Sequence, residues 1–186
     1  SYLGYGAGLR YNFLQPLAVK ASFEHSVRLP LARELLGNGT TVYANVALRP
    51  EKSDNVNLGL FGTWHPAGAH TLSYELNGFL RFLDDYIQAT VSEKEGMMQY
   101  ENVPAVNIRG MEGEVRYDFD GRLRLSANIS YQDARDKRKL KDDGKPSATY
   151  MNRVPNRPWL FSSSEASYTF HDLFLHGSHL RIGMDY

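Results

Sequence analysis

The sequence contains no cysteine, so disulfide bonds and thiolate metal sites are excluded. It also lacks any apolar run of the roughly 18 residues that a transmembrane helix needs, and residues 1–4 show neither the basic nor the apolar region of a signal peptide. The formal charge is zero, with 21 basic and 21 acidic residues, which gives no electrostatic reason to expect nucleic acid as a partner. Membrane β-strands remain possible, because alternation rather than continuous hydrophobicity marks them.

The stretch from Ala47 to Phe82 carries the pattern on which the rest of the chain is built. From Asn55 to Trp64 apolar residues alternate with polar ones, and after a turn at 65–70 the alternation resumes through Phe82. A period of two is typical of a β-strand with one apolar face. Two such strands joined by a short turn predict a hairpin.

The same alternation predicts further strands along the whole chain, at 3–13, 17–28, 111–119, 123–132, 160–170 and 180–186. Short turns are expected at 15–16, 66–69 and 120–121. Long connections are expected at 29–54, with a helical turn at 31–36, at 92–104, with a polar tip at 92–96, and at 133–156. Residues 84–91 extend the strand before the second of these connections.

Short and long connections alternate strictly, which describes an antiparallel up-and-down meander of about eight long strands. Strands of about 12 residues, rising about 3.3 Å per residue and tilted by about 45°, span close to the apolar slab of a bilayer. Strands of soluble proteins average only about 5–6 residues. We therefore predict an all-β fold that forms a section of a larger transmembrane β-barrel.

The two faces of the predicted strands agree with this fold. One face carries charged residues in succession, Glu112, Glu114, Arg116 and Asp118, which suits a water-filled lumen. The other face ends in aromatic residues next to the short turns, in the manner of an interfacial girdle: Phe13, Trp64, Phe119, Tyr168 and Phe170. The alternative is a soluble β-sandwich whose aromatic residues fill a core. The connection pattern and the strand lengths favour the barrel.

Several short motifs, in the same order as in the family, resemble those of TonB-dependent outer-membrane receptors. The segment from Asn45 to Ser53 is similar to the family's N-x-x-L-x-P-E-x-S, although Asn57 stands where the following strand usually has glutamate. The remaining similar segments are Arg28-Leu29-Pro30, Glu34-Leu35, Tyr100-Glu101-Asn102, Arg109-Gly110-Met111-Glu112-Gly113-Glu114 and Arg153 to Pro158. Within them we interpret one set as structural motif residues: Arg49, Pro50, Glu51, Arg109, Gly110 and Glu112.

The resemblance implies a 22-stranded barrel of the bacterial outer membrane, plugged by an N-terminal domain. Such receptors import a scarce nutrient, such as a siderophore-iron complex, a vitamin or a glycan, with energy from the inner-membrane TonB complex. Residues 1–186 would form a late, partial barrel domain, without the plug and without the barrel's C-terminus. The implied partners are membrane lipid, the imported ligand and the energising complex, which is reached through the absent plug; no cofactor is implied.

We expect a ligand to meet the lumen-facing charges and the connections at 29–54, 84–107 and 133–156. An isolated fragment would self-associate through its unpaired edges or its apolar face. The alternative function is that of a soluble all-β binding or adhesion module without transport activity.

Other groups of residues carry side chains that can bind metals or take part in catalysis. His171, His176 and His179, with Asp172, are interpreted as polar turn residues rather than as metal ligands. Asp133, Asp136, Asp142 and Asp143 lack the order of a calcium loop. The basic run at 135–141 is interpreted as a solvated loop tip, with contact to anionic lipid headgroups or to an anionic ligand as the alternative. Ser162-Ser163-Ser164 has no evident base beside it. We therefore expect no enzymatic activity.

Overall fold

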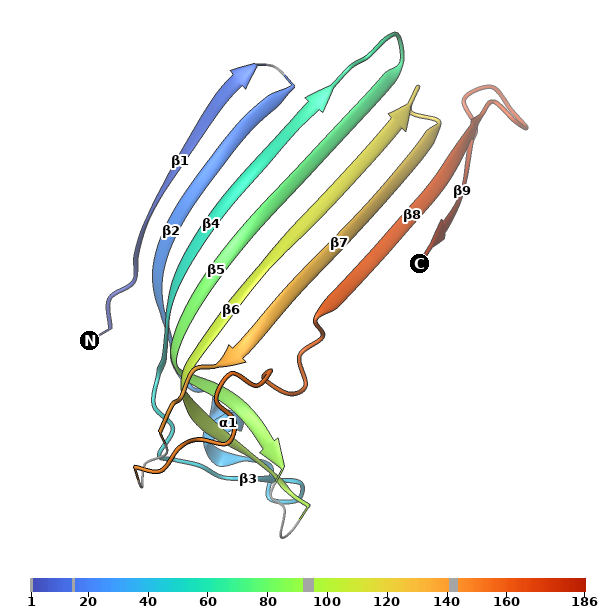
Figure 1. Ribbon diagram of the computed structural model, residues 1–186. Coiled ribbons are helices and arrows are strands. Elements are labelled where there is room, and N and C mark those ends of the chain that lie inside the picture. Colours follow the sequence, from blue (N-terminus) through green and yellow to red (C-terminus); the bar gives the residue numbers. More distant parts are fainter. Residues whose placement is uncertain (1, 15, 92–95, 141–143) are drawn as a thin grey trace.

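The computed structural model describes residues 2–14, 16–91, 96–140 and 144–186. Its long strands are β1 (Tyr5–Leu14), β2 (Leu17–Arg28), β4 (Glu51–Trp64), β5 (His70–Val91), β6 (Met98–Phe119), β7 (Leu123–Asp136), β8 (Leu160–His171) and β9 (His179–Asp185). They form one antiparallel sheet in chain order, with β1 and β9 as its two edges (Figure 1). The predicted meander of about eight long strands is confirmed, and the sheet is not closed.

The connections divide between the two ends of the sheet. Those after β1, β4, β6 and β8 lie at the upper end in Figure 1, which we call the short-turn end. The opposite, long-connection end holds α1 (Ala32–Leu36) and β3 (Val42–Tyr43), which pairs in parallel with β6. The helical turn expected at 31–36 is therefore confirmed. In the part of the chain that the structure describes, no helix is long and apolar enough to cross a membrane.

The long connection expected at 92–104 is wrong. β5 continues to Val91, which confirms the extension expected at 84–91, but β6 already starts at Met98, so the two strands project beyond the sheet as a paired ribbon. Where this ribbon begins, Asp85 takes a left-handed conformation (φ 55°) and Pro104 has no N–H to donate. The pairing register nevertheless continues on both sides of these residues. Of the polar tip expected at 92–96, residues 92–95 lie outside the described residues.

Two further boundaries differ from those expected. β4 begins at Glu51, directly after Pro50, rather than at Asn55, and β7 continues to Asp136. In both places the additional strand residues are polar or charged, except for Ala134, so an apolar alternation does not mark them. Ion pairs and backbone pairing extend the strands instead.

The buried core lies at the long-connection end and not along the sheet. It is a cluster of apolar side chains from β5, β6, β7 and the connection after β7: Phe79, Leu83, Tyr86, Val106, Ile108, Ala134 and Val154. Elsewhere the large apolar side chains stay exposed, as at Leu9 (72%) and Leu58 (61%). All described strands belong to one sheet, so the two-sheet core of the soluble alternative is not what these apolar residues form.

Candidate functional site

Pairing in register gives the sheet one polar and one apolar face. One row of paired residues crosses the polar face as Asn12, Ala18, Phe61, Glu75, Glu114, Asn128 and Ser163. The adjacent row, on the apolar face, crosses as Tyr11, Val19, Leu60, Leu76, Gly113, Ile129 and Ser162. The aromatic residues expected beside the short turns are exposed and lie near the strand ends there: Phe13, Trp64, Phe119, Tyr168 and Phe170.

Near the short-turn end the polar face contains a hollow of about 570 Å³. The Lys20 ammonium forms an ion pair with Glu75 across β4, and the Arg10 guanidinium lies 4.6 Å from the centre of the Phe61 ring. A Cβ at Gly59 would lie 2.5 Å from Cε of Lys20. Glycine at this position therefore leaves the space through which the lysine reaches its partner.

Toward β9 the polar face continues with more ion pairs. Arg124 Nε donates to Asp118 Oδ2 at 2.8 Å, and Arg181 Nη2 donates to Glu165 Oε1 and to Ser167 Oγ, both at 2.9 Å. The charged side chains of these pairs are between 35% and 56% exposed. Charges of both signs in contact with solvent make this face suitable for water and polar solutes rather than for apolar ones.

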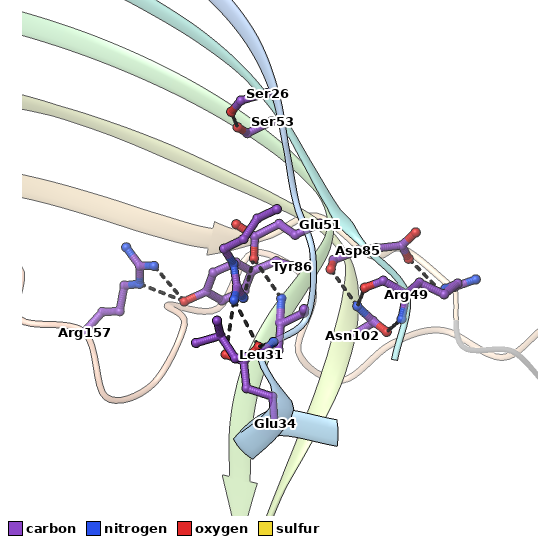
Figure 2. A network of polar contacts seen from close by, with 12 residues as sticks. Ser26, Leu31, Glu34, Arg49, Glu51, Ser53, Asp85, Tyr86, Asn102 and Arg157 are labelled. Atoms are coloured by element: carbon purple, nitrogen blue, oxygen red, sulfur yellow. Dashed lines mark hydrogen bonds and ion pairs between the residues drawn. The ribbon is translucent and has the colours of Figure 1, made fainter. Parts of the chain in front are cut away.

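At the long-connection end, Arg28 bridges two carboxylates. Its Nη1 donates to both oxygens of Glu34, at 3.1 and 3.0 Å, and its Nη2 donates to Glu51 Oε2 at 3.3 Å. Glu34 also accepts the Leu31 N–H at the start of α1 (2.8 Å), and Glu51 accepts the Ile87 N–H (3.0 Å; Figure 2). These contacts tie α1 and β5 to the ends of β2 and β4. The carboxylates of Glu34 and Glu51 are only 7% and 12% exposed, so the contacts are largely shielded from water.

A second network fastens the connection between β2 and β4 to the ribbon of β5 and β6. The Arg49 N–H donates to Asn102 Oδ1 (2.8 Å), and Asn102 Nδ2 donates to the carbonyls of Arg49 (3.0 Å) and Asp85 (2.7 Å; Figure 2). The Arg49 side chain pairs with Asp85 at 2.7 Å. Asn45 Nδ2 donates to the Tyr100 carbonyl at 2.8 Å. Motif residues about 50 positions apart in the sequence thus meet here.

The Arg109-Gly110-Met111-Glu112 motif divides between the two faces. Arg109 lies on the apolar face, where its side chain is 73% exposed and Nη2 donates to Asp133 Oδ2 at 3.3 Å. Gly110 and Glu112 lie on the polar face. A Cβ at Gly110 would lie 2.4 Å from the ring of Phe79, so glycine leaves the space that this buried ring fills.

The aspartates considered for calcium bind arginines and a hydroxyl instead. Asp133 Oδ1 accepts from Arg135 Nε (2.8 Å) and from Arg153 Nε (3.1 Å), in addition to the contact with Arg109. Asp136 accepts the Thr149 hydroxyl at 2.6 Å. The other two aspartates of that set, at 142 and 143, lie outside the described residues.

The three histidines do not converge on a site. His171 and His179 face each other at the paired ends of β8 and β9, with ring centres 4.8 Å apart, while His176 is fully exposed and lies 3.5 Å from Asp172. Among the described residues, no group of three metal-ligating side chains comes together. In β8, Ser163 accepts Asn128 Nδ2 at 2.7 Å.

The basic run at 135–141 is only partly free for an external partner. Lys137 Nζ lies 3.0 Å from the Met151 sulfur, and Arg138 lies 4.0 Å from Asp136; position 141 lies outside the described residues.

One contact at this end was not predicted from the sequence. The Arg157 guanidinium donates to the Tyr86 hydroxyl at 3.0 and 2.7 Å (Figure 2). Neither residue carries an alternation signal, so the sequence offered no pattern to find it.

An open antiparallel meander with a polar face, an exposed apolar face and its long connections at one end defines a section of an outer-membrane-type β-barrel wall. The chain matches the family described as TonB dependent receptor-like, beta-barrel, over residues 2–186. It therefore belongs to the β-barrel family of TonB-dependent receptors, which are outer-membrane receptors and transporters. The resemblance seen in the short motifs is confirmed.

Solved structures of this family share the fold at low sequence identity. The copper transporter OprC matches 90% of the chain and 24% of its own length, with 19% identity and a TM-score of 0.66. The Serratia marcescens hemophore receptor HasR, solved with its hemophore and heme, matches 91% and 30%, with 18% identity and a TM-score of 0.62. The siderophore receptor PirA from Acinetobacter baumannii matches 91% and 27%, with 20% identity and a TM-score of 0.60.

The chain thus spans about a quarter to a third of the length of these structures. No protein of the curated set matches the sequence.

Proposed function

We propose that the chain is a wall section of an outer-membrane active transporter that imports a scarce nutrient, energised by the TonB complex. The nutrient classes we propose are a siderophore-iron complex, a vitamin or a glycan. Relatives with the same fold are described as a copper transporter, a hemophore receptor and a siderophore receptor. Metal ions and heme therefore join the candidates for the imported ligand.

The observation that carries the proposal is the separation of the two faces. The apolar row through Leu60, Leu76 and Ile129 is exposed on one face, and the charged row through Glu75 and Glu114 lies on the other. In a membrane barrel the first face meets lipid and the second lines an aqueous interior. A water-soluble module would cover the first face.

In this proposal a ligand meets the polar face and the connections at the long-connection end, which lies outside the cell. The connection between β2 and β4 and the one between β7 and β8 carry polar side chains there. Residues 84–91 and 98–107 take part as paired strands instead of as a loop, because β5 and β6 stay paired there. The Arg28 and Asn102 networks position these segments rather than binding the ligand themselves.

The test is uptake by the full-length receptor in bacterial cells. Cells that depend on the receptor are given radiolabelled ferric siderophores, heme, copper or vitamin B12, with and without a functional TonB complex. We expect accumulation of one of these compounds, and its loss when the complex is absent. Uptake that is unaffected by loss of the complex would contradict active transport.

A further inference from the structure

The apolar face contains a hollow beside an arginine. Its volume is about 760 Å³, and the side chains that bound it include Val56, Leu58, Leu76, Leu80, Met111 and Arg109. Gly78 is one of the residues that line it, paired with Leu58 on one side and with Met111 on the other. A Cβ built at Gly78 meets no atom closer than the Leu58 carbonyl oxygen at 3.9 Å. The hollow therefore exists because this position has no side chain.

The position of Arg109 along the strand places it at the edge of the apolar band. It lies ten residues from Phe119, the last residue of β6 at the short-turn end. Ten residues correspond to about 33 Å along a strand, and a tilt of about 40° reduces this to about 25 Å along the membrane normal, which is the height of the apolar band of such barrels. An arginine at this level reaches the lipid headgroups, whereas one at mid-depth would be costly.

Arg109 belongs to a group with excess positive charge. Three guanidinium groups, those of Arg109, Arg135 and Arg153, share the single carboxylate of Asp133. Asp133 is 2% exposed, whereas the Arg109 and Arg153 side chains are 73% and 45% exposed. The group therefore presents unused N–H donors and a net positive charge to the surface. Forked guanidinium donors match the oxygen geometry of a phosphate.

We propose that the hollow and this arginine group bind one acyl lipid whose phosphate headgroup has a net negative charge, as a specific ligand. An acyl chain lies over Gly78 between Leu58, Leu76 and Met111, and the phosphate contacts Arg109. Charge complementarity favours such a lipid, because the apolar hollow suits an acyl chain and the arginine group beside it, at the level of the headgroups, suits a negatively charged headgroup. The inference rests on the proposed location in the outer membrane and adds a defined lipid site to general lipid contact.

The experiment is native mass spectrometry of the full-length receptor in detergent micelles. The probes are phosphatidylglycerol and phosphatidylcholine with identical acyl chains, which differ in net charge. The test variants are Arg109→Gln, which leaves Asp133 two arginine partners, and Gly78→Phe, which fills the hollow. The matched controls are Arg116→Gln, an arginine of the same strand on the polar face, and Leu9→Phe, which adds bulk to the apolar face away from the hollow.

We expect the receptor to retain one phosphatidylglycerol at least about tenfold more tightly than phosphatidylcholine, equal to about 1.4 kcal/mol. Arg109→Gln removes this preference, Gly78→Phe weakens retention of both lipids, and both controls behave as wild type. Equal retention of the two lipids by the wild type, or equal effects of Arg109→Gln and Arg116→Gln, would overturn the inference.

Uptake is measured with the wild type, Arg109→Gln and Gly78→Phe so that the two proposals can be separated. Lipid retention that lacks the expected preference, with TonB-dependent uptake intact, overturns only the lipid site. Uptake that proceeds without the TonB complex overturns the transport proposal, and the lipid measurements still decide the lipid site.

Discussion

Side chains of the same type lie in opposite surroundings in two regions of this sheet. Ile129 in the middle of β7 is 54% exposed on the apolar face, whereas Ile108 in β6, toward the long-connection end, is 2% exposed within the buried cluster. Ion pairs differ in the same way. Glu165 and Arg181 are about half exposed, whereas Glu34 is 7% exposed against Arg28.

The difference shows that only one end of the chain supplies its own core. At the long-connection end the chain buries apolar side chains and pairs carboxylates with its own residues. The segments that do this are α1, the ribbon of β5 and β6 and the segment around Val154. We call the remainder of the sheet, between that end and the short turns, the wall. The wall pairs its backbone from strand to strand, except along the outer edges of β1 and β9, but leaves its apolar face for an external medium. Its stability therefore depends on lipid and on neighbouring strands.

The largest expected effect follows from removing that medium. The isolated 186-residue chain exposes the apolar face of the wall and the free edges of β1 and β9 to water. We expect it to form large assemblies in detergent-free buffer and smaller, defined species in detergent micelles, as measured by light scattering. A monodisperse monomer in plain buffer would contradict the membrane assignment of the apolar face.

The next effect compares the two isoleucines directly. Ile108→Ala leaves a cavity in the buried cluster, and such changes cost about 2–5 kcal/mol. Ile129→Ala forfeits only the transfer of methyl and methylene groups into lipid, at most about 2 kcal/mol, because acyl chains close over the site. Urea unfolding of the full-length receptor in lipid vesicles measures both. Equal costs would show that the two positions are packed alike.

A third comparison concerns the carboxylates that hold the long-connection end. Glu34→Gln removes one of the two negative charges that Arg28 faces and weakens the acceptor for the Leu31 N–H at the start of α1. Hydrogen bonds to charged groups contribute about 1.5–3 kcal/mol, so we expect a loss of about 2 kcal/mol in the same unfolding measurement. Faster proteolysis between β2 and β4 should accompany it. Unchanged proteolysis would contradict the anchoring role of this contact.

The sequence predicted the wall well and the long-connection end only in part. Alternation is a local signal, and each wall strand carries it because one face is apolar and the other polar, as around Leu60 and Glu75. The same rule failed for the start of β6, from Met98 to Pro104, which pairs with the extension of β5. There both faces are mixed, and the pairing is specified by contacts with distant segments such as that of Asn102 with Arg49.

For the candidate site, the sequence predicted the residues of the motifs but not their contacts. The motif residues Arg28, Glu34, Asn45 and Asn102 could be picked out by their resemblance to a family, but which of them touch could not be read from their spacing. The position of Arg109 on the apolar face can be predicted from the sequence, because Arg109 lies an even number of residues from Met111 and Val115 in one strand. The hollow at Gly78 could not be predicted in this way, because it depends on the pairing register of three strands.

The smallest expected effect is at the exposed ion pairs of the wall. Glu165→Gln removes the partner of Arg181 on the polar face, where both side chains are about half exposed and Arg181 keeps its contact with Ser167. Exposed pairs contribute about 0–1 kcal/mol, so the unfolding free energy should fall by less than about 1 kcal/mol. Salt near 1 M, where the screening length is about 3 Å, should abolish that fall, whereas the loss in Glu34→Gln should persist. A loss at Glu165 that matches the one at Glu34 and resists salt would mean that the polar face is shielded from water, and the assignment of an aqueous interior would fail.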